Sequence, residues 1–191
     1  MYKLCKTEQS AQRQRQLEEG LLHAMQNQRY EDISVSDLCD QMGIPRKSFY
    51  RYFASKDGAL HALIDHRLMD YETRRGTTSI GGRNGLYLDL PWFFEFWQDQ
   101  RPLLDALSRS DISGLLVTRS IAYSQQEQLL DFGSRQYFQD KDYQSSAIAF
   151  AVCGLMTLVI QWHHDGYRQT PQEMAELTYK IMSKPLISNE K

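Results

Sequence analysis

The chain has 191 residues, of which 41% are hydrophobic and 24% are charged. This balance is typical of a soluble globular protein with one domain or two small ones, and it excludes general disorder. The formal net charge is −2 and the isoelectric point is about 6.2, which excludes a chain that is basic throughout and wraps nucleic acid by its overall charge. The three cysteines, at positions 5, 39 and 153, are too far apart to indicate a disulfide scaffold or a zinc finger.

Charge is unevenly distributed along the chain. Residues 1–75 hold 12 basic and 11 acidic residues, whereas residues 76–191 hold 10 and 13. The interval from Gln41 to Lys56 contains four basic residues and no acidic one. Most charge runs are simply solvated surface, so this interval alone leaves open whether the stripe meets an anion.

The first third of the chain predicts four helices. Apolar residues at helical spacing predict an amphipathic helix over residues 8–28. Ser34 is a good N-cap for a short helix whose apolar face holds Val35, Leu38, Cys39 and Met42. Gly43 stands where that helix must end, and we expect it to adopt a positive φ.

Pro45 suits the first turn of the next helix, PRKSFYRYF, because its missing N–H costs nothing there. Ser55 can cap a fourth helix, SKDGALHALIDHRLMDYE. The segment from Thr73 to Leu86 holds four of the eleven glycines, which predicts a flexible connection. Beyond it, helices are expected at about 91–108, 111–135, 143–166 and 171–183. No segment alternates with period 2 for long enough to predict a strand, so the expected architecture is all-α.

Residues 34–53 have the pattern of a helix-turn-helix, which places its second helix in the major groove of DNA. Phe49 and Phe53 are four residues apart and should face inward. Arg46 and Lys47, near the start of the helix, can reach guanine or a phosphate. Lys56, at the start of the following helix, can add a cation to a phosphate.

The segment ISVSDLCDQMGIPRKSFYRYFASKDGALHALID resembles the N-terminal DNA-binding part of the tetracycline-repressor (TetR) family, and FYRYF followed by SK is its most specific part. The resemblance covers residues 10–66 and continues more loosely through WFFEFWQDQRPLLDAL and FAVCGLMTLVIQWHHDGYRQTPQEMAEL. It implies a three-helix helix-turn-helix domain over residues 1–70 and a helical regulatory and dimerisation domain over residues 71–191. It further implies a homodimeric regulator, usually a repressor, that binds a palindromic double-stranded DNA operator and responds to a small-molecule effector.

The resemblance also implies which positions touch DNA, and they are Ser34, Arg46, Lys47, Ser48, Tyr50, Arg51, Tyr52 and Lys56. Three residues depart from the family pattern. Pro45 stands where a capping Ser or Thr is common, Gly58 where a strong helix former is usual, and Cys39 where Ala is common. These departures put the base contacts, but not the motif, in question.

Aromatic residues gather in the C-terminal part, most densely in LPWFFEFW (residues 90–97). One interpretation is a packed helical core, and the other is the wall of a pocket for a flat or apolar effector. Both can hold, because the resemblance implies a ligand inside this domain. The expected lining residues are Trp92, Phe93, Phe96, Trp97, Tyr123 and Met156.

The run from Ala147 to Ile160 holds 14 residues without a charge. A membrane span needs roughly 20 residues, so a core or interface helix is the favoured interpretation and a membrane span the alternative. By resemblance, helices 143–166 and 171–183 form a dimer interface. Its small and apolar face would consist of Ala147, Ala151, Gly154, Leu155 and Leu158.

The sequence does not predict a metal site, a cofactor or an active site. The neighbours His163 and His164 point to different faces of a helix, and His61 and His66 are poorly aligned for one metal. No nucleophile elbow, phosphate loop or zinc-protease motif is present. The N-terminus lacks the apolar core of a secretory signal, and we expect a cytoplasmic protein. The alternatives are a protein of this fold that acts through protein partners without reading a palindrome, and an enzyme built on the aromatic pocket.

Overall fold

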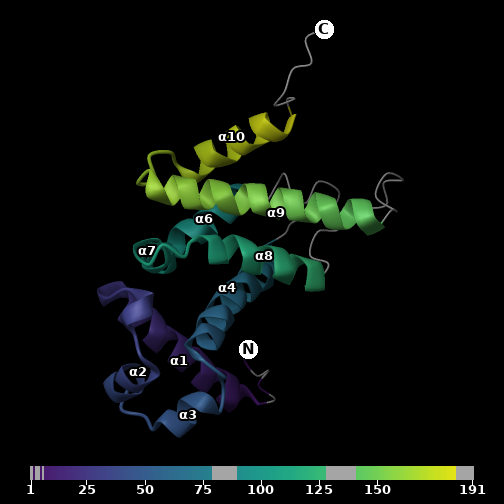
Figure 1. Ribbon diagram of the computed structural model, residues 1–191. Helices are drawn as coiled ribbons and strands as arrows, with labels where there is room; N and C mark the ends of the chain where they lie inside the picture. The colour runs from purple at the N-terminus through teal and green to yellow at the C-terminus, as the bar shows by residue number, and fades with distance from the viewer. Residues whose placement is uncertain (1, 3–4, 6, 79–89, 128–140, 184–191) are drawn as a thin grey trace.

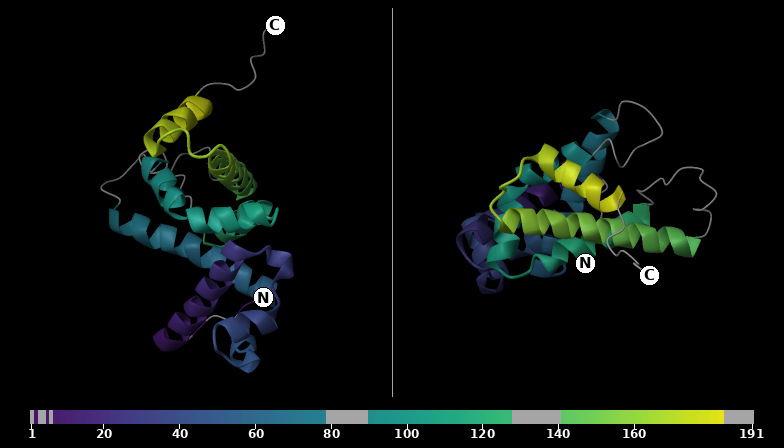
Figure 2. Two further views of the ribbon diagram at one scale, coloured as in Figure 1. Left: turned by 90° about the vertical axis from the view of Figure 1, so that its left-hand side faces the viewer. Right: turned by 90° about the horizontal axis from the view of Figure 1, so that it is seen from above.

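The computed structural model describes residues 2, 5, 7–78, 90–127 and 141–183, and these ranges are helical with short connections. Figure 1 shows three levels: α1, α2 and α3 lie at one end, α4 crosses the middle, and the C-terminal helices form the other end. The 90° views in Figure 2 show the same separation. The all-α expectation is confirmed.

The N-terminal helices begin and end close to the expected residues. They are α1 (Glu8–Asn27), the 3-10 turn η1 (Tyr30–Asp32), α2 (Val35–Gln41), α3 (Arg46–Tyr50) and α4 (Lys56–Thr78). The Ser34 hydroxyl accepts the Asp37 N–H at 3.0 Å, and the Ser55 hydroxyl accepts the Gly58 N–H at 3.1 Å, so both predicted caps are present. Gly43 has φ +63°, as predicted for the residue that ends α2.

Helix α4 extends further than the glycine content of the sequence indicates. It continues to Thr78, so the first part of the expected connection, from Thr73 onward, is helical. Tyr71 packs on α6 just before this extension, with its ring 4.8 Å from that of Trp92, and Arg74 within the extension lies 5.8 Å from the centre of the Phe96 ring. Residues 79–86 of that connection lie outside the described residues. The expected domain boundary at residue 70 falls inside this continuous helix.

The C-terminal part contains α6 (Leu90–Asp99), α7 (Arg101–Arg109), α8 (Gly114–Glu127), α9 (Lys141–His164) and α10 (Pro171–Ser183). The single helix expected at 91–108 is wrong: the chain breaks at Gln100, because Pro102 cannot donate an N–H to the preceding turn and instead starts α7. Helix α8 begins three residues later than expected, after Asp111 turns the chain with φ 55°. The remainder of the segment expected to reach residue 135 lies outside the described residues.

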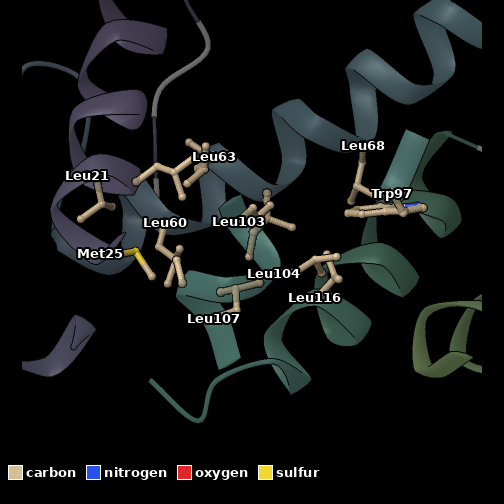
Figure 3. Close-up of a cluster of buried hydrophobic side chains, with 14 of the residues drawn as sticks. Leu21, Met25, Leu60, Leu63, Leu68, Trp97, Leu103, Leu104, Leu107 and Leu116 are labelled. Atoms are coloured by element: carbon tan, nitrogen blue, oxygen red, sulfur yellow. The ribbon is translucent and has the colours of Figure 1, made fainter. Parts of the chain in front are cut away.

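One hydrophobic core runs through both ends of the molecule. Helix α4 packs on α1 and α8, α1 packs on α7, α9 lies along α8, and α10 packs on α6. Figure 3 shows the side chains of α1 and α4 meeting those of α7, with Leu116 of α8 and Trp97 of α6 beyond them. Because α4 contributes to both groups of helices, a change in its position affects the N-terminal and C-terminal parts together.

Candidate DNA-binding surface

The turn between α2 and α3 is held by backbone hydrogen bonds. The Gly43 N–H donates to the Asp40 carbonyl at 3.1 Å, and the Ile44 N–H donates to the Cys39 carbonyl at 2.9 Å. These bonds satisfy carbonyl groups at the end of α2 that the helix itself leaves unpaired. The Phe49 side chain of α3 is fully buried. The arrangement therefore fixes α3 against α2 and leaves its other face open.

The open face of α3 is basic. Arg46, Lys47, Tyr50 and Arg51 are exposed, and Ser48 is half-buried beside them. In the part of the chain that the structure describes, no ion pair involves Arg46, Lys47 or Arg51. Their cationic groups are therefore available to an external anion such as a phosphate.

The first turn of α3 lacks a side-chain cap, because Pro45 occupies the N-cap position. The backbone compensates in part: the Ser48 N–H donates to the Pro45 carbonyl at 2.8 Å. The helix is also shorter than PRKSFYRYF indicates, since it ends at Tyr50 and is followed by a turn through Arg51 and Tyr52. The sequence predicts that this helix lacks a side-chain cap, and the structure confirms it: α3 is short and uncapped.

Ser34 lies at the border of this surface. Its side chain is exposed, and its hydroxyl donates to the Asp37 carboxylate at 2.6 Å while accepting the Asp37 N–H. The hydroxyl therefore already acts as both a hydrogen-bond donor and an acceptor at the start of α2.

Two of the residues expected to touch DNA lie away from the open face. The Tyr52 side chain is packed beside Phe53, and the residue is only 7% exposed. The Lys56 ammonium donates to the carbonyl groups of Tyr30 and Ile33, each at 2.5 Å, and sits 4.3 Å from the centre of the Tyr30 ring. Burial lowers the pKa of Lys56. In this structure Lys56 joins α4 to the turn before α2.

No pattern in the sequence predicts the contacts of Tyr30 with Lys56 and Asp57. Tyr30 lies in the polar break NQRYED, where no periodicity marks it. The structure shows the Tyr30 hydroxyl donating to Asp57 at 2.6 Å while its carbonyl accepts from Lys56. Burial and the Asp57 hydrogen bond both raise the Tyr30 pKa. The two residues that follow Ser55 therefore hold the helix-turn-helix against α4.

Comparison with known protein families identifies the family of the chain. Residues 22–63 match the model for bacterial regulatory proteins of the tetR family, and residues 94–184 match a model for the C-terminal region of transcriptional regulators of this type. The chain belongs to the TetR family. It is a DNA-binding transcriptional regulator, as the resemblance in the N-terminal segment implied.

A solved structure has the fold of this TetR protein over nearly its whole length. It is the fatty acid degradation regulator FadR from Bacillus halodurans, which matches with a TM-score of 0.60 and 11% sequence identity, over 96% of this chain and 98% of that one. At this identity the likeness concerns the fold alone. A search of curated proteins gives no match.

The C-terminal part of this TetR-family chain brings most of the expected pocket residues together. Trp92, Phe93, Phe96 and Trp97 of α6 form one aromatic cluster with Tyr71 of α4. Tyr123 comes from α8 and Met156 from α9, which pack on each other, and all six belong to the core or lie against it. The Trp97 residue is fully buried, and its indole N–H has no hydrogen-bond partner among the described residues.

A separate hollow of about 290 Å³ lies where α7, α8 and α9 meet. His163 stands in it and contacts the Asp105 carboxylate at 2.7 Å. Among the described residues, no three His, Cys, Asp or Glu side chains are grouped so that they could hold a metal ion. The hollow does not include the expected aromatic lining; it is lined by Ser108, Asp111, Ser113, Gly114, Ile160, His163 and His164.

Helix α9 has an apolar face that the rest of this TetR-family chain leaves uncovered. Val152, Met156 and Val159 are buried, whereas Phe150 is 78% exposed. Among the residues expected at an interface, Gly154 is exposed and the other four are half-buried: Ala147, Ala151, Leu155 and Leu158. Phe150 is the most exposed large apolar residue described on this helix, and the sequence did not predict it at an interface. By length and composition Ser145–His164 could cross a membrane, and only 24% of it is buried.

Proposed function

We propose that the protein is a cytoplasmic, ligand-responsive repressor that binds a palindromic operator as a homodimer. The observation that carries the proposal is the open face of α3, where three exposed cationic side chains, Arg46, Lys47 and Arg51, form no ion pair with any described residue. A recognition helix needs such groups to contact phosphates and base edges. Ser48 and Tyr50 would add hydroxyl contacts, and Ser34 would lie at the edge of the site.

The homodimer is supported by α9. A helix that is apolar on all sides is stable in water only when all its faces are covered, yet its Phe150 side is uncovered in one chain. A second copy of the same helix offers the same apolar surface, and pairing through one shared patch generates two-fold symmetry. Leu177 and Met182 on α10 are exposed as well.

The two-fold symmetry of a dimer determines the symmetry of its operator. Two recognition helices related by a two-fold axis read half-sites in opposite orientation, so the site is a palindrome with half-sites about 34–36 Å apart. Duplication also doubles the basic surface, which explains how a chain with a net charge of −2 binds a polyanion.

Ligand response is supported by the aromatic cluster between α4 and α6. Flat or apolar molecules bind in apolar sites that contain a few polar groups. The unpaired indole N–H of Trp97 is a buried donor for which such a ligand would supply an acceptor. Because Tyr71 places α4 in the same cluster, a ligand that displaces these rings would move the helix that also packs on α1.

Substitution of the exposed basic side chains of α3 tests DNA binding. An operator is first selected from random double-stranded DNA with the wild-type protein. Arg46→Ala and Lys47→Ala should then each weaken its binding, by about 1–3 kcal/mol for a lost base contact, measured by gel shift at fixed salt. Gln125→Ala, an exposed residue on α8, is the control. Unchanged affinity of both variants would show that α3 does not read the operator.

A further inference from the structure

The Asp65 carboxylate joins three parts of the molecule. It lies in the middle of α4 and is only 5% exposed. Arg119 of α8 donates its Nε–H to one carboxylate oxygen at 2.8 Å and an Nη2–H to the other. The Tyr2 hydroxyl donates to the second oxygen at 2.8 Å. Helix α8 belongs to the regulatory part, whereas Tyr2 belongs to the segment before α1.

Tyr2 is in turn tied to the end of the recognition region. Its backbone forms an antiparallel bridge with Phe53, the residue that follows the turn after α3. The ring of Tyr2 stands edge-on to that of His66, with 5.8 Å between their centres. The Phe53 N–H donates to the Phe49 carbonyl at 3.1 Å, which connects the bridge to α3. The path from α8 to α3 therefore consists of two side chains, one carboxylate and one backbone bridge.

The network is energetically coupled, because a buried carboxylate needs all its donors. Removal of Arg119 leaves the buried Asp65 carboxylate without its counter-ion, and removal of the Tyr2 hydroxyl takes one of two described donors from one of its oxygens. The hydrogen bond to Asp65 raises the pKa of Arg119, and burial together with the same carboxylate raises the pKa of Tyr2. Helix α8 therefore cannot move away from α4 without disturbing the hydrogen bond that holds Tyr2.

We propose that Tyr2, Asp65 and Arg119 form a latch through which the position of α8 controls the position of α3. A second connection lies beyond the end of α1, where the Tyr30 N–H donates to the Ser110 hydroxyl at 2.8 Å and Arg29 pairs with Asp111 at 3.2 Å. The latch restricts rotation of the N-terminal helices about that connection. Its effect on operator affinity rests on the proposed function, whereas its effect on the mobility of residues 50–54 does not.

Hydrogen exchange of the full-length protein without DNA tests the latch directly. Arg119→Gln and Tyr2→Phe should each accelerate amide exchange over residues 50–54 about 5-fold or more, and the double variant should exchange no faster than the faster single variant. Arg15→Gln is the matched control, because Arg15 forms a two-bond ion pair with Asp70 of α4 that does not reach α8. That control should leave exchange over residues 50–54 unchanged.

Three results would overturn the latch: unchanged exchange in Tyr2→Phe, equal acceleration in Arg15→Gln, or single effects that multiply in the double variant. Tyr2→Phe removes a hydroxyl alone and keeps the test valid if Arg119→Gln does not fold. Operator affinity gives a second measurement, in which Arg119→Gln should weaken binding about 5-fold or more in the wild-type background but less than about 2-fold in Tyr2→Phe. A wild-type protein that selects no DNA would refute the proposed function, while the exchange result would still decide the latch.

Discussion

Lys56 shows how a cationic residue beside a recognition helix acquires a structural role. Its ammonium is bonded to two backbone carbonyls in the turn before α2, and the aromatic ring of Tyr30 covers it. The Tyr30 carbonyl also accepts the Ile33 N–H at 3.2 Å, so the Lys56 ammonium adds a second donor to it and ties the turn to α4. The contact fixes the angle between α2 and α4, and through it the direction in which α3 projects.

Replacing Lys56 should therefore destabilise the fold. Lys56→Gln loses charge-assisted hydrogen bonds that typically contribute about 1.5–3 kcal/mol, and urea unfolding should show a decrease of this size in the free energy of unfolding. Lys47→Gln is the control, because Lys47 is exposed and should change stability by less than about 0.5 kcal/mol. Equal stability of the two variants would indicate that the ammonium does not hold the turn.

Residues with local roles were predictable from the sequence, and Lys56 was not. The Ser34 cap and the positive φ of Gly43 depend on atoms within a few residues, so the local pattern determined them. The carbonyl partners of Lys56 lie 23 and 26 residues earlier in the chain. Tyr2 is 63 residues from Asp65. Only the packing of the helices brings such groups together.

At the level of the helices, α9 shows where periodicity fails. Buried Val152 and Met156 and exposed Phe150 are all apolar, so the sequence does not distinguish the buried side from the exposed side. The interface face expected from small and apolar residues includes Leu155, and this residue is half-buried. Charging Leu155 would therefore disturb the fold of one chain as well as an interface.

Phe150 is the more direct probe of the proposed dimer. Phe150→Glu places a charge on the exposed apolar face and should yield monomers or aggregates, because two carboxylates would be buried face to face without partners. Light scattering gives the mass, with Gln125→Glu on α8 as the control. A normal dimer mass for Phe150→Glu would place the interface elsewhere.

Helix ends were predicted where local chemistry sets them and missed where tertiary packing does. Pro171 begins α10 and Gly166, with φ +75°, follows α9, as expected. Helix α4 instead continues past Thr73, where Arg74 contacts the Phe96 ring of α6, a contact between segments that are distant in sequence. The break before Pro102 follows the polar residues 98–101, and apolar residues at helical spacing on both sides of it predict one continuous helix.

For the whole molecule, dimerisation should make stability depend on concentration. If folding and pairing are linked, each tenfold increase in concentration adds about 1.4 kcal/mol per dimer and raises Tm by roughly 2 °C. Scanning calorimetry at two concentrations 100-fold apart should thus give Tm values about 4 °C apart. Phe150→Glu, if it folds as a monomer, should show no such difference. An equal Tm for the wild type at both concentrations would contradict linked folding and pairing.

The core that α4 shares between the two ends of the molecule has a practical consequence for protein engineering. Leu60 and Leu63 lie among the side chains of α1 and α7, as Figure 3 shows, and α4 is a continuous helix through residue 70. A fragment that ends at residue 70 would expose the leucines that α7 covers, and it would lack the last eight residues of α4. The DNA-reading part is therefore not a transplantable module, and a chimaera with new operator specificity is better made by exchanging surface residues of α3 than by fusing domains.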